Sequence, residues 1–355
     1  MASGPSRAFI VHTSTSQIGG AEASLLAAVS QSPVTPFFLV PSEGPLTREL
    51  SSLGIGYRVL AWPRGLSELT QRSWRHWLAL PMVLPGLVPY LFRLYAAVRE
   101  AKGSAEGGDG KGAGTIWSSG LKSHAALVVL SPWLGKSILF DIRDFLKPLA
   151  MRRLITGAAM RFGCRVNANS KSVARDYPGA EVHYPMVKLP RAPVDRRSRG
   201  GKRIITHLAY FAPYKGQDLF LSCARKLLDA GVDAEFWIIG DVIYPAAAYE
   251  RYREDIYAQA GRLNLSAHVR FLGKVGGGEE VQALLEQTDL LLHCTREPEP
   301  FGRSVMEALL CGCEAICHRD NGVCEVTEAG ADFPEWLRQL RSVLGPEYVR
   351  LGLKP

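Results

Sequence analysis

The richest group of residues able to do chemistry in this 355-residue chain is the run Glu297-Pro-Glu-Pro-Phe-Gly-Arg-Ser-Val-Met-Glu307. Glu299 and Glu307 lie eight positions apart, with Phe301 and Gly302 between them. Two carboxylates at the start of a helix can accept hydrogen bonds from sugar hydroxyls, and the free N–H groups there can bind anions. Gly302 would let the backbone approach such a ligand closely. The alternative is a solvated acidic loop before an ordinary helix.

A lysine in a glycine turn supplies a second kind of chemistry. Lys215-Gly-Gln217 follows a predicted strand, and a cation there, with N–H groups, can stabilise negative charge that develops on a bound ligand. Such a site needs no metal ion. The chain also lacks an Asp-x-Asp motif, which disfavours the alternative, a metal-dependent site. The paired carboxylates would also suit glycoside hydrolysis, in which water is the nucleophile. A Lys-Gly turn beside them suits the binding of a nucleotide better than the activation of water.

Alternating strands and helices must position these residues. Apolar runs predict strands at 8–12, 37–40, 57–61, 115–117, 137–141 and 164–168, and again at 203–209, 234–240, 269–272, 290–293 and 314–317. Helical patterns separate them, which predicts parallel sheets covered on both faces. The sequence therefore predicts two doubly wound α/β domains with a ligand cleft between them, at the carboxyl ends of the strands.

Composition shifts give the expected domain boundaries. The stretch 189–202 is rich in Pro, Arg and Gly and reads as a linker. It separates an N-terminal domain (1–188) from a C-terminal domain (203–328). A helical tail over 329–355 is expected to follow, with one amphipathic helix at 334–344. Gly103–Gly114 reads as a loop.

Charge and cysteine usage narrow the class of protein. The chain has 42 Lys and Arg against 34 Asp and Glu, a net charge of +8, which favours an anionic ligand or surface. Seven cysteines, with no apolar leader near Met1, predict reduced thiols in a cytoplasmic protein. No stretch offers the roughly 20 uninterrupted apolar residues of a membrane span.

Taken in order, the motifs resemble those of family 4 of the retaining glycosyltransferases (glycosyl transferases group 1), whose GT-B fold has two Rossmann-like domains. Residues 299–307 resemble the family's E-x7-E motif, and Lys215-Gly-Gln217 resembles its donor-phosphate turn R-x-x-x-x-x-K-G-Q. Four further segments match in the expected order: Gly19-Gly-Ala-Glu22, Ile238-Ile-Gly-Asp241, Val269-Arg-Phe-Leu-Gly-Lys-Val275 and Met306-Glu-Ala-Leu-Leu-Cys-Gly312. The resemblance covers most of residues 8–325.

The resemblance implies specific roles around a nucleotide-diphosphate sugar. Lys215 would hold the diphosphate, Glu307 the ribose and Glu299 the transferred sugar. The other expected donor-binding residues would act largely through backbone, as base cradle, strand end, sugar contact or closing loop: Gly19, Gly20, Gly240, Lys274, Val275, Phe301 and Gly302. The implied reaction is transfer of a hexose-type sugar to a glycan or lipid-linked acceptor, as in polysaccharide biosynthesis, with retention of configuration and without metal or cofactor.

The chain departs from the family pattern at two places in this site. Where the family usually has Arg six residues before the lysine, this chain has Ala209 or Tyr210. Arg303 is the expected substitute, because Arg can bind phosphate through two N–H groups. We therefore group Arg303 with Glu299 and Lys215 as catalytic, the alternative being a solvent-exposed helix-start residue. Asn321 stands where the family often has glycine, and Asn tolerates left-handed backbone.

The acceptor side is expected in the first domain. Phe140-Asp-Ile-Arg-Asp144 ends a predicted strand where the family often has a His-containing cluster that faces the sugar. Asp141, Arg143 and Asp144 are candidates to touch donor or acceptor, and an internal ion pair or helix cap is the alternative. His124 is a further candidate, although it suits the face of a helix better.

Residues 72–99 mix aromatic side chains with Arg72, Arg75, Arg93 and Arg99, a pattern typical of helices at a membrane surface. This predicts a protein that lies peripherally at the inner face of a membrane. The alternative is a pair of core helices broken at prolines.

Other classes of protein fit the sequence less well. The spacing of Cys311, Cys313, Cys317 and Cys324 lacks the paired rhythm of zinc sites. A nicotinamide dehydrogenase would need G-x-G-x-x-G after the first strand, which Gly19-Gly-Ala-Glu22 does not supply. Nucleic-acid binding would need a basic–aromatic platform, and outside residues 72–99 the basic residues are dispersed. The main alternative is a catalytically weak binding or scaffold subunit that keeps the GT-B shape.

Overall fold

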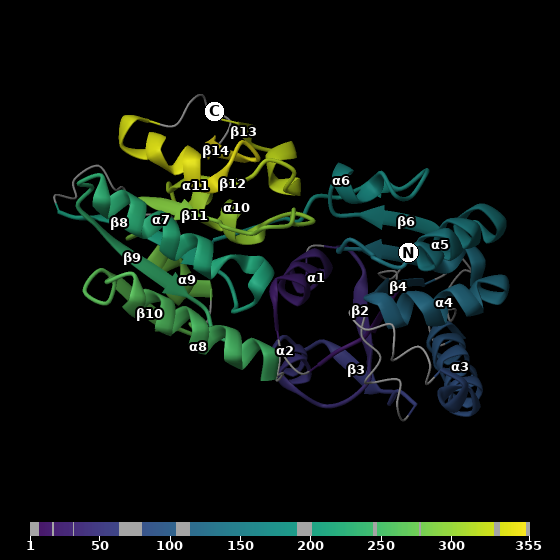
Figure 1. The fold of residues 1–355 in the computed structure, drawn as a ribbon. Helices are drawn as coiled ribbons and strands as arrows, with labels where there is room; N and C mark the ends of the chain where they lie inside the picture. Colours follow the sequence, from purple (N-terminus) through teal and green to yellow (C-terminus); the bar gives the residue numbers. More distant parts are fainter. Residues whose placement is uncertain are drawn as a thin grey trace. The chain divides into compact units, whose positions relative to one another are not determined.

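The computed structural model describes residues 7–15, 18–30, 32–63, 80–103, 114–189, 201–243, 247–276, 278–329 and 334–352. The chain forms two compact units, Met1–Met186 and Val187–Pro355 (Figure 1). Residues 190–200 of the predicted linker (189–202) lie outside the described residues, as do 104–113 of the predicted loop.

The N-terminal unit is a parallel sheet of seven strands in the order β3-β2-β1-β4-β5-β6-β7. The strands are β1 (Arg7–His12), β2 (Thr35–Val40), β3 (Gly56–Val59), β4 (Thr115–Ser119), β5 (Ile138–Ile142), β6 (Arg165–Ala168) and β7 (Glu181–Val182). Between them run α1 (Gly20–Ser30), α2 (Pro45–Ser52), α3 (Leu80–Gly103), α4 (Leu121–Leu134), η2 (Gly135–Ser137), α5 (Leu149–Phe162) and α6 (Lys171–Ala174). The order reverses between β1 and β4, which is where ligands bind in Rossmann-like sheets.

Side chains along β1 point alternately to the two faces of the sheet, and both faces are covered by helices. Ala8 and Ile10 are buried in a cluster with side chains of α1 and α2. Val11 belongs instead to a cluster that contains Leu94 of α3 and Leu127 of α4. Because successive side chains of a strand point to opposite faces, an apolar run without polar interruptions is what a doubly covered strand requires.

The C-terminal unit has a second seven-stranded sheet in the order β10-β9-β8-β11-β12-β14-β13. Its strands are β8 (Arg203–Leu208), β9 (Ala234–Ile239), β10 (Val269–Gly273), β11 (Leu290–Leu292), β12 (Glu314–His318), β13 (Glu328–Ala329) and β14 (Tyr348–Gly352). Its helices are η3 (Pro213–Lys215), α7 (Gln217–Asp229), α8 (Ala247–Arg262), α9 (Gly278–Leu285), α10 (Arg303–Leu310), η4 (Gly322–Glu325), η5 (Glu335–Leu340) and α11 (Arg341–Leu344). The first five strands of the order are parallel.

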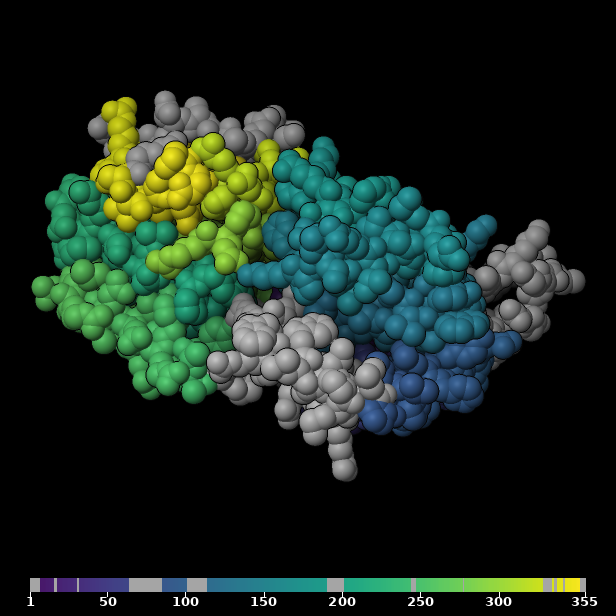
Figure 2. All heavy atoms as spheres, turned by 45° about the vertical axis from the view of Figure 1, so that its right-hand side comes forward, coloured from purple at the N-terminus to yellow at the C-terminus, as the bar shows by residue number. Residues whose placement is uncertain are grey.

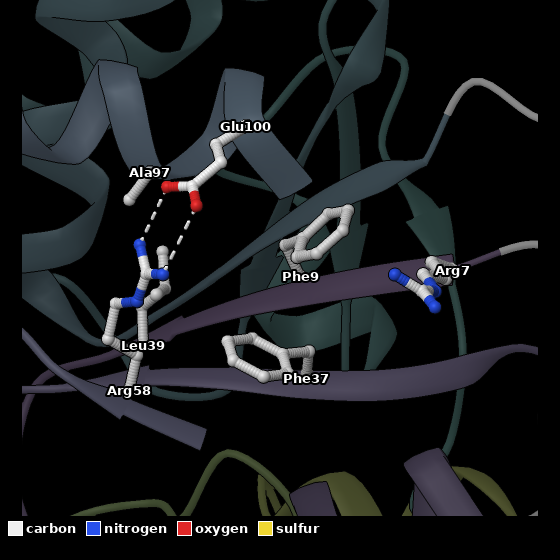
Figure 3. Close-up of a pocket in the computed structure, with 7 residues that line it drawn as sticks. All are labelled: Arg7, Phe9, Phe37, Leu39, Arg58, Ala97 and Glu100. Atoms are coloured by element: carbon white, nitrogen blue, oxygen red, sulfur yellow. Dashed lines mark hydrogen bonds and ion pairs between the residues drawn. The ribbon is translucent and has the colours of Figure 1, made fainter. Parts of the chain in front are cut away.

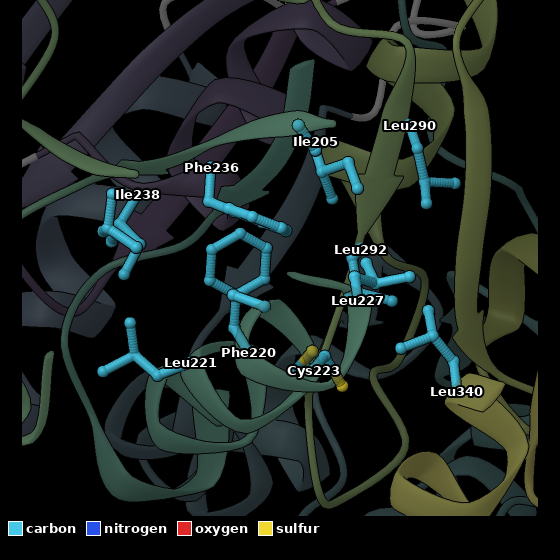
Figure 4. Packing of buried hydrophobic residues seen from close by; sticks show 14 of the residues in the cluster. Ile205, Phe220, Leu221, Cys223, Leu227, Phe236, Ile238, Leu290, Leu292 and Leu340 are labelled. Atoms are coloured by element: carbon cyan, nitrogen blue, oxygen red, sulfur yellow. The ribbon is translucent and has the colours of Figure 1, made fainter. Parts of the chain in front are cut away.

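The core of this unit lies between the sheet and α7. Ile205, Phe236 and Leu292 point from the strands toward Phe220 and Leu227 of the helix, all of them fully buried (Figure 4). The apolar positions of α7 recur at helical spacing, so one face of the helix packs on the sheet while the other meets solvent.

The tail differs from the prediction. The expected helix at 334–344 is a 3-10 turn, η5, followed by the short α11, and the chain then forms β14 rather than continuing as helix. β14 pairs antiparallel with β12, His318 opposite Tyr348, and the Tyr348 hydroxyl donates to the Thr295 carbonyl at 2.8 Å. The tail therefore extends the sheet and braces the chain after β11.

The prolines in α3 do not divide it into a helix pair, because the helix runs from Leu80 to Gly103 through Pro85 and Pro89. Tyr90 and Leu94 are buried in the core, whereas Val88 and Phe92 are about 70% and 72% exposed. Figure 2 shows α3 in blue at the surface of the molecule. Residues 72–79 of the predicted membrane segment lie outside the described residues. Within the described ranges, none of the helices combines the length and the apolar character needed to cross a membrane.

Candidate functional site

Three chain segments of the C-terminal unit bring polar residues to the carboxyl edge of its parallel strands. Lys215 ends the turn after β8, Glu299 lies in the loop between β11 and α10, and Asn321 follows β12. These strands are neighbours in the sheet, in the order β8-β11-β12. Carboxyl ends of adjacent parallel strands share one edge, which is where ligands bind in such sheets.

Gly216 fixes the position of the lysine turn. Its φ is +75°, and a Cβ at this position would lie 1.9 Å from the carbonyl oxygen of Cys294. Only glycine fits this combination of left-handed backbone and close approach. The turn is therefore pressed against the residue that follows β11, and this places Lys215 beside the Glu299 loop.

Lys215 and Glu299 are in direct contact. The Lys215 ammonium donates to Glu299 Oε1, and His293 Nε2 lies 3.4 Å from Glu299 Oε2. The ammonium also lies 5.0 Å from the ring centre of Tyr210 and 5.2 Å from that of Tyr214, within the range of cation–π attraction. Tyr210 thus contacts the lysine in the segment where the resembled family carries an arginine.

These contacts control the ionisation of Glu299. Burial alone would raise its pKa, but the charges and hydrogen bonds of Lys215 and His293 hold the pKa far below the usual value. Glu299 therefore stays a carboxylate, able to accept hydrogen bonds, across the physiological range.

Asn321 holds the Glu299 loop through a short ladder of hydrogen bonds. The Glu299 N–H donates to Asn321 Oδ1 at 2.7 Å. In return, the Gly322 N–H donates to the Glu299 carbonyl at 3.1 Å and the Val323 N–H to the Phe301 carbonyl at 2.6 Å. Asn321 is 1% exposed, so its side chain stands in for a backbone carbonyl inside the protein. Its own φ is −66°, so the tolerance for left-handed backbone invoked from the sequence is not needed.

Glu307 and Arg303 form an ion pair along α10. Arg303 Nε donates to Glu307 Oε1 at 2.7 Å, one helical turn away. Gly302 precedes the helix with φ +95°, and the side chain of Phe301, the residue before it, is buried. Arg303, the residue predicted to bind phosphate, therefore pairs with Glu307, the residue predicted to bind the ribose. Both side chains stay partly exposed.

An ion pair between Arg296 and Asp218 links the segment after β11 to the lysine turn and to α7. The Arg296 guanidinium donates to Asp218 of α7 at 2.8 and 2.5 Å and to the Pro213 carbonyl at 2.9 Å. Its own N–H donates to the Tyr214 carbonyl at 2.9 Å. The guanidinium and the Tyr252 hydroxyl outweigh burial and lower the pKa of Asp218.

The remaining expected donor-binding residues of this unit lie at the ends of β9 and β10. Gly240 has φ +131°, and a Cβ there would lie 2.1 Å from the Ala209 carbonyl oxygen. The absence of a side chain at Gly240 lets the segment that follows β8 pass close to the end of β9. Lys274 is exposed and Val275 partly buried after β10.

In the N-terminal unit, Gly19 and Gly20 lie at the start of α1, after β1. The Gly19 N–H donates to Glu22 Oε2 at 2.9 Å, and His12 Nε2 lies 3.5 Å from Glu22 Oε1. Burial opposes the charge of Glu22, but His12 and the Gly19 N–H lower its pKa. The glycine loop is therefore anchored to the end of β1 by a carboxylate.

The four acceptor-side candidates have different surroundings. Arg143 Nε donates to Asp141 Oδ2 at 2.6 Å after β5, and the exposed Asp144 accepts from the Phe145 N–H at 2.8 Å. His124 is 1% exposed, lies 2.5 Å from the Ser118 hydroxyl, and has its pKa lowered to about 3 by burial. A neutral, enclosed imidazole is positioned to support the fold more than to meet a ligand.

A pocket of the N-terminal unit lies away from these residues. Phe9, Phe37 and Leu39 form its apolar part, and Arg58 and Glu100 pair across it at 3.0 Å (Figure 3). Arg7, the first residue of β1, lines it as well. Among the residues that the structure describes, no group of three or more His, Cys, Asp or Glu side chains is arranged to hold a metal.

From the sequence, His293 at the end of a buried strand could either reach the ligand site or serve the fold, with the structural role favoured, and Asn321 was linked only to turn geometry. The structure brings both side chains onto Glu299. Their position directly after apolar strands was the available signal, because carboxyl ends of parallel strands converge. The sequence contains no comparable signal for the Arg296–Asp218 pair, because the two residues lie 78 positions apart.

Comparison with known proteins agrees with this architecture. Residues 191–333 match the family described as "Glycosyl transferases group 1". That segment includes Lys215, Glu299, Glu307 and Asn321. A search of curated proteins found no match.

Solved structures share the fold over nearly the whole chain. HepE of Anabaena, in complex with UDP, has a TM-score of 0.70 at 19% identity, covering 95% of this chain and 88% of that one. A glycosyltransferase of Rickettsia africae reaches 0.67 at 13%, covering 95% and 87%. An α,α-trehalose-phosphate synthase of Burkholderia xenovorans reaches 0.64 at 12%, covering 95% and 91%. The α/β fold with two Rossmann-like units, of the GT-B class, is thereby confirmed.

Proposed function

We propose that the protein is a glycosyltransferase that uses a nucleotide-diphosphate sugar. The observation that carries this proposal is the meeting of Lys215, His293, Glu299 and Asn321 at one sheet edge, within the segment that matches the glycosyltransferase family. UDP and UDP-glucose in complexes of HepE, which has a similar fold, support the class of donor.

Each residue has a role that its surroundings allow. Lys215 supplies positive charge to the diphosphate as it leaves, which stabilises the transition state. Glu299, held as a carboxylate, accepts hydrogen bonds from hydroxyls of the transferred sugar. Glu307 does the same for the ribose, and Arg303 orients Glu307 while its guanidinium lies near the start of α10.

The finer features of the reaction belong to the same proposal. We expect retention of configuration, because the resembled family retains it, and no metal, because Lys215 and the N–H groups at the start of α10 supply the positive potential. We also propose a glycan or lipid-linked acceptor. Val88 and Phe92, exposed on α3 near Arg93 and Arg99, support contact with an anionic membrane surface.

Thermal unfolding in the presence of nucleotides tests the donor site. We expect one of the uridine, guanosine or adenosine diphosphates, or their sugars, to raise the unfolding temperature. A ligand at 100 times its dissociation constant adds about 2.7 kcal/mol to the unfolding free energy. The shift should disappear in Glu307→Ala and Lys215→Ala, whereas Lys226→Ala, in the last turn of α7, should keep it. A folded protein that no nucleotide stabilises would contradict the proposal.

One observation favours a second candidate, a binding or scaffold subunit with little turnover. Lys215 and Arg303, the two cations expected at the diphosphate, are each engaged with a carboxylate of the site. Nucleotide-sugar binding without transfer to any acceptor would favour this second function, and release of free nucleotide diphosphate in the presence of an acceptor would exclude it.

A further inference from the structure

Two cysteines flank the segment that holds the Glu299 loop. Cys317 is fully buried in β12, and Cys324 is partly exposed in η4. Their sulfur atoms lie 3.7 Å apart. The residues between them include Asn321, Gly322 and Val323, which make the three hydrogen bonds to Glu299 and Phe301.

We propose that Cys317 and Cys324 form a thiol pair that a peroxide oxidises to a disulfide, and that this modification shifts the Glu299 loop. A disulfide needs its sulfurs about 2.05 Å apart. The pair must therefore move together from 3.7 Å. Because β12 lies inside the sheet, paired with β11 and β14, the movement falls on η4 and the turn before it.

The surroundings of the two thiols suit this chemistry. The hydrogen bond from Cys317 lowers the pKa of Cys324 despite its burial, so Cys324 is the better nucleophile of the two. It is also the more accessible, whereas Cys317 is buried. Accessibility and thiolate character together make Cys324 the attacking thiol and Cys317 the resolving thiol.

The reaction balances with peroxide as the only oxidant. The Cys324 thiolate attacks one peroxide oxygen, so an S–O bond forms, the O–O bond breaks, and hydroxide leaves. The Cys317 thiol then attacks the sulfenic sulfur, an S–S bond forms, the S–O bond breaks, and water leaves with the Cys317 proton. In total the two thiols lose two electrons and two protons, and peroxide becomes two waters.

The chemical part of the test does not depend on the proposed function. The full chain is treated with hydrogen peroxide, blocked with N-ethylmaleimide and digested with trypsin. Arg319 lies between the cysteines, so the disulfide would join peptides 304–319 and 320–338. We expect this linked pair, its loss after reduction, and dimedone labelling of Cys324 in Cys317→Ser. Cys223 and Cys294 also contact each other but are fully buried, and they should stay unlinked.

The coupling to the site is read in two ways. Hydrogen exchange of residues 297–302, measured without nucleotide, should accelerate on oxidation and recover on reduction. Affinity for the nucleotide-diphosphate sugar should fall about tenfold, the size of one hydrogen bond between a sugar hydroxyl and the charged Glu299 carboxylate. This second readout rests on the proposed function. Reduced protein that binds no nucleotide would contradict that function, while the disulfide and the exchange rate still decide the thiol pair.

Two results would overturn the inference. One is the absence of the linked peptides in peroxide-treated protein that stays folded by circular dichroism. The other is a disulfide that forms in wild type but leaves the exchange of residues 297–302 and the affinity for the nucleotide sugar the same as in peroxide-treated Cys324→Ser, which cannot form it.

Discussion

At the scale of single residues, Glu299 shows how this site keeps a charge in a partly buried place. Its carboxylate touches an ammonium and an imidazole, and its backbone is tied by Asn321 and Gly322. Loss of any one contact leaves a carboxylate that burial penalises. A change in any of these contacting residues should therefore alter the stability of the Glu299 carboxylate.

The depressed pKa of Glu299 predicts a pH dependence of stability. Between the usual value of 4.5 and the lower value in the folded protein, the unfolded chain binds more protons. Stability from this group is therefore fully present above about pH 4.5 and is lost as pH falls through the folded pKa. Urea unfolding from about pH 5.5 to about pH 3 should show a shallower fall in Glu299→Gln than in wild type. Asp229→Asn, in an exposed pair with Arg225, serves as control, and equal slopes in Glu299→Gln and wild type would contradict the prediction.

Asn321 should separate support of the loop from general stability. Asn321→Ala removes the acceptor for the Glu299 N–H, so we expect about 1–2 kcal/mol of lost unfolding free energy and weaker binding of the nucleotide sugar. Thr327→Val is a matched control, because the Thr327 hydroxyl donates to the Val323 carbonyl at 2.9 Å without touching Glu299. Isothermal titration should show weakened binding in Asn321→Ala alone. The same loss in both variants would make the effect merely structural.

At the scale of elements, the glycine turns fix where strand ends meet. Gly216 and Gly231 both have positive φ, at +75° and +78°, but only a Cβ at 216 would strike another residue. Gly231→Ala should cost about 1–2 kcal/mol for left-handed backbone. Gly216→Ala should cost clearly more, since the Cys294 carbonyl must move, and should also weaken nucleotide binding. Thermal unfolding of both variants measures the difference, and equal shifts would mean that the lysine turn is not pressed against Cys294.

The exposed apolar side chains of α3 predict membrane contact. The double variant Val88→Ser/Phe92→Ser should reduce sedimentation with vesicles rich in anionic lipid and leave the unfolding temperature nearly unchanged, because both side chains are exposed. Met160→Ser, at a comparably exposed apolar position on α5, provides the control. Equal sedimentation of wild type and the double variant would remove α3 from the proposed acceptor side.

The elements also show where sequence reasoning succeeds. The strands flanking the site were predictable, because runs such as Leu290–Leu292 are apolar on both faces and end at polar residues. β14 was not, since Tyr348–Gly352 carries Arg350 and draws its stability from antiparallel pairing with β12. The motifs predicted Lys215 and Glu299 as residues of one candidate site. Their direct contact was not predictable, because it depends on a turn geometry that Gly216 and Cys294 set together.

At the scale of the whole molecule, each unit has a core of its own. Leu94 belongs to the cluster formed by α3, α4 and α5 with their sheet, and Leu227 to the cluster around α7. The residues proposed to hold the diphosphate and the ribose all lie in the C-terminal unit, while Gly19 and Gly20 lie in the other. The two units should therefore respond differently to a nucleotide.

Calorimetry of the full chain tests this division. Leu94→Ala and Leu227→Ala each remove a fully buried side chain, at a cost of about 2–5 kcal/mol, and should lower different unfolding transitions. A bound nucleotide diphosphate should raise the transition that Leu227→Ala lowers, because ligand binding stabilises the unit that holds it. If the nucleotide raises the transition sensitive to Leu94→Ala by the same amount, the glycine loop at Gly19 and Gly20 contributes binding energy comparable to that of Lys215. In that case Gly20→Val, which leaves Lys215 intact, should abolish the rise of that transition alone.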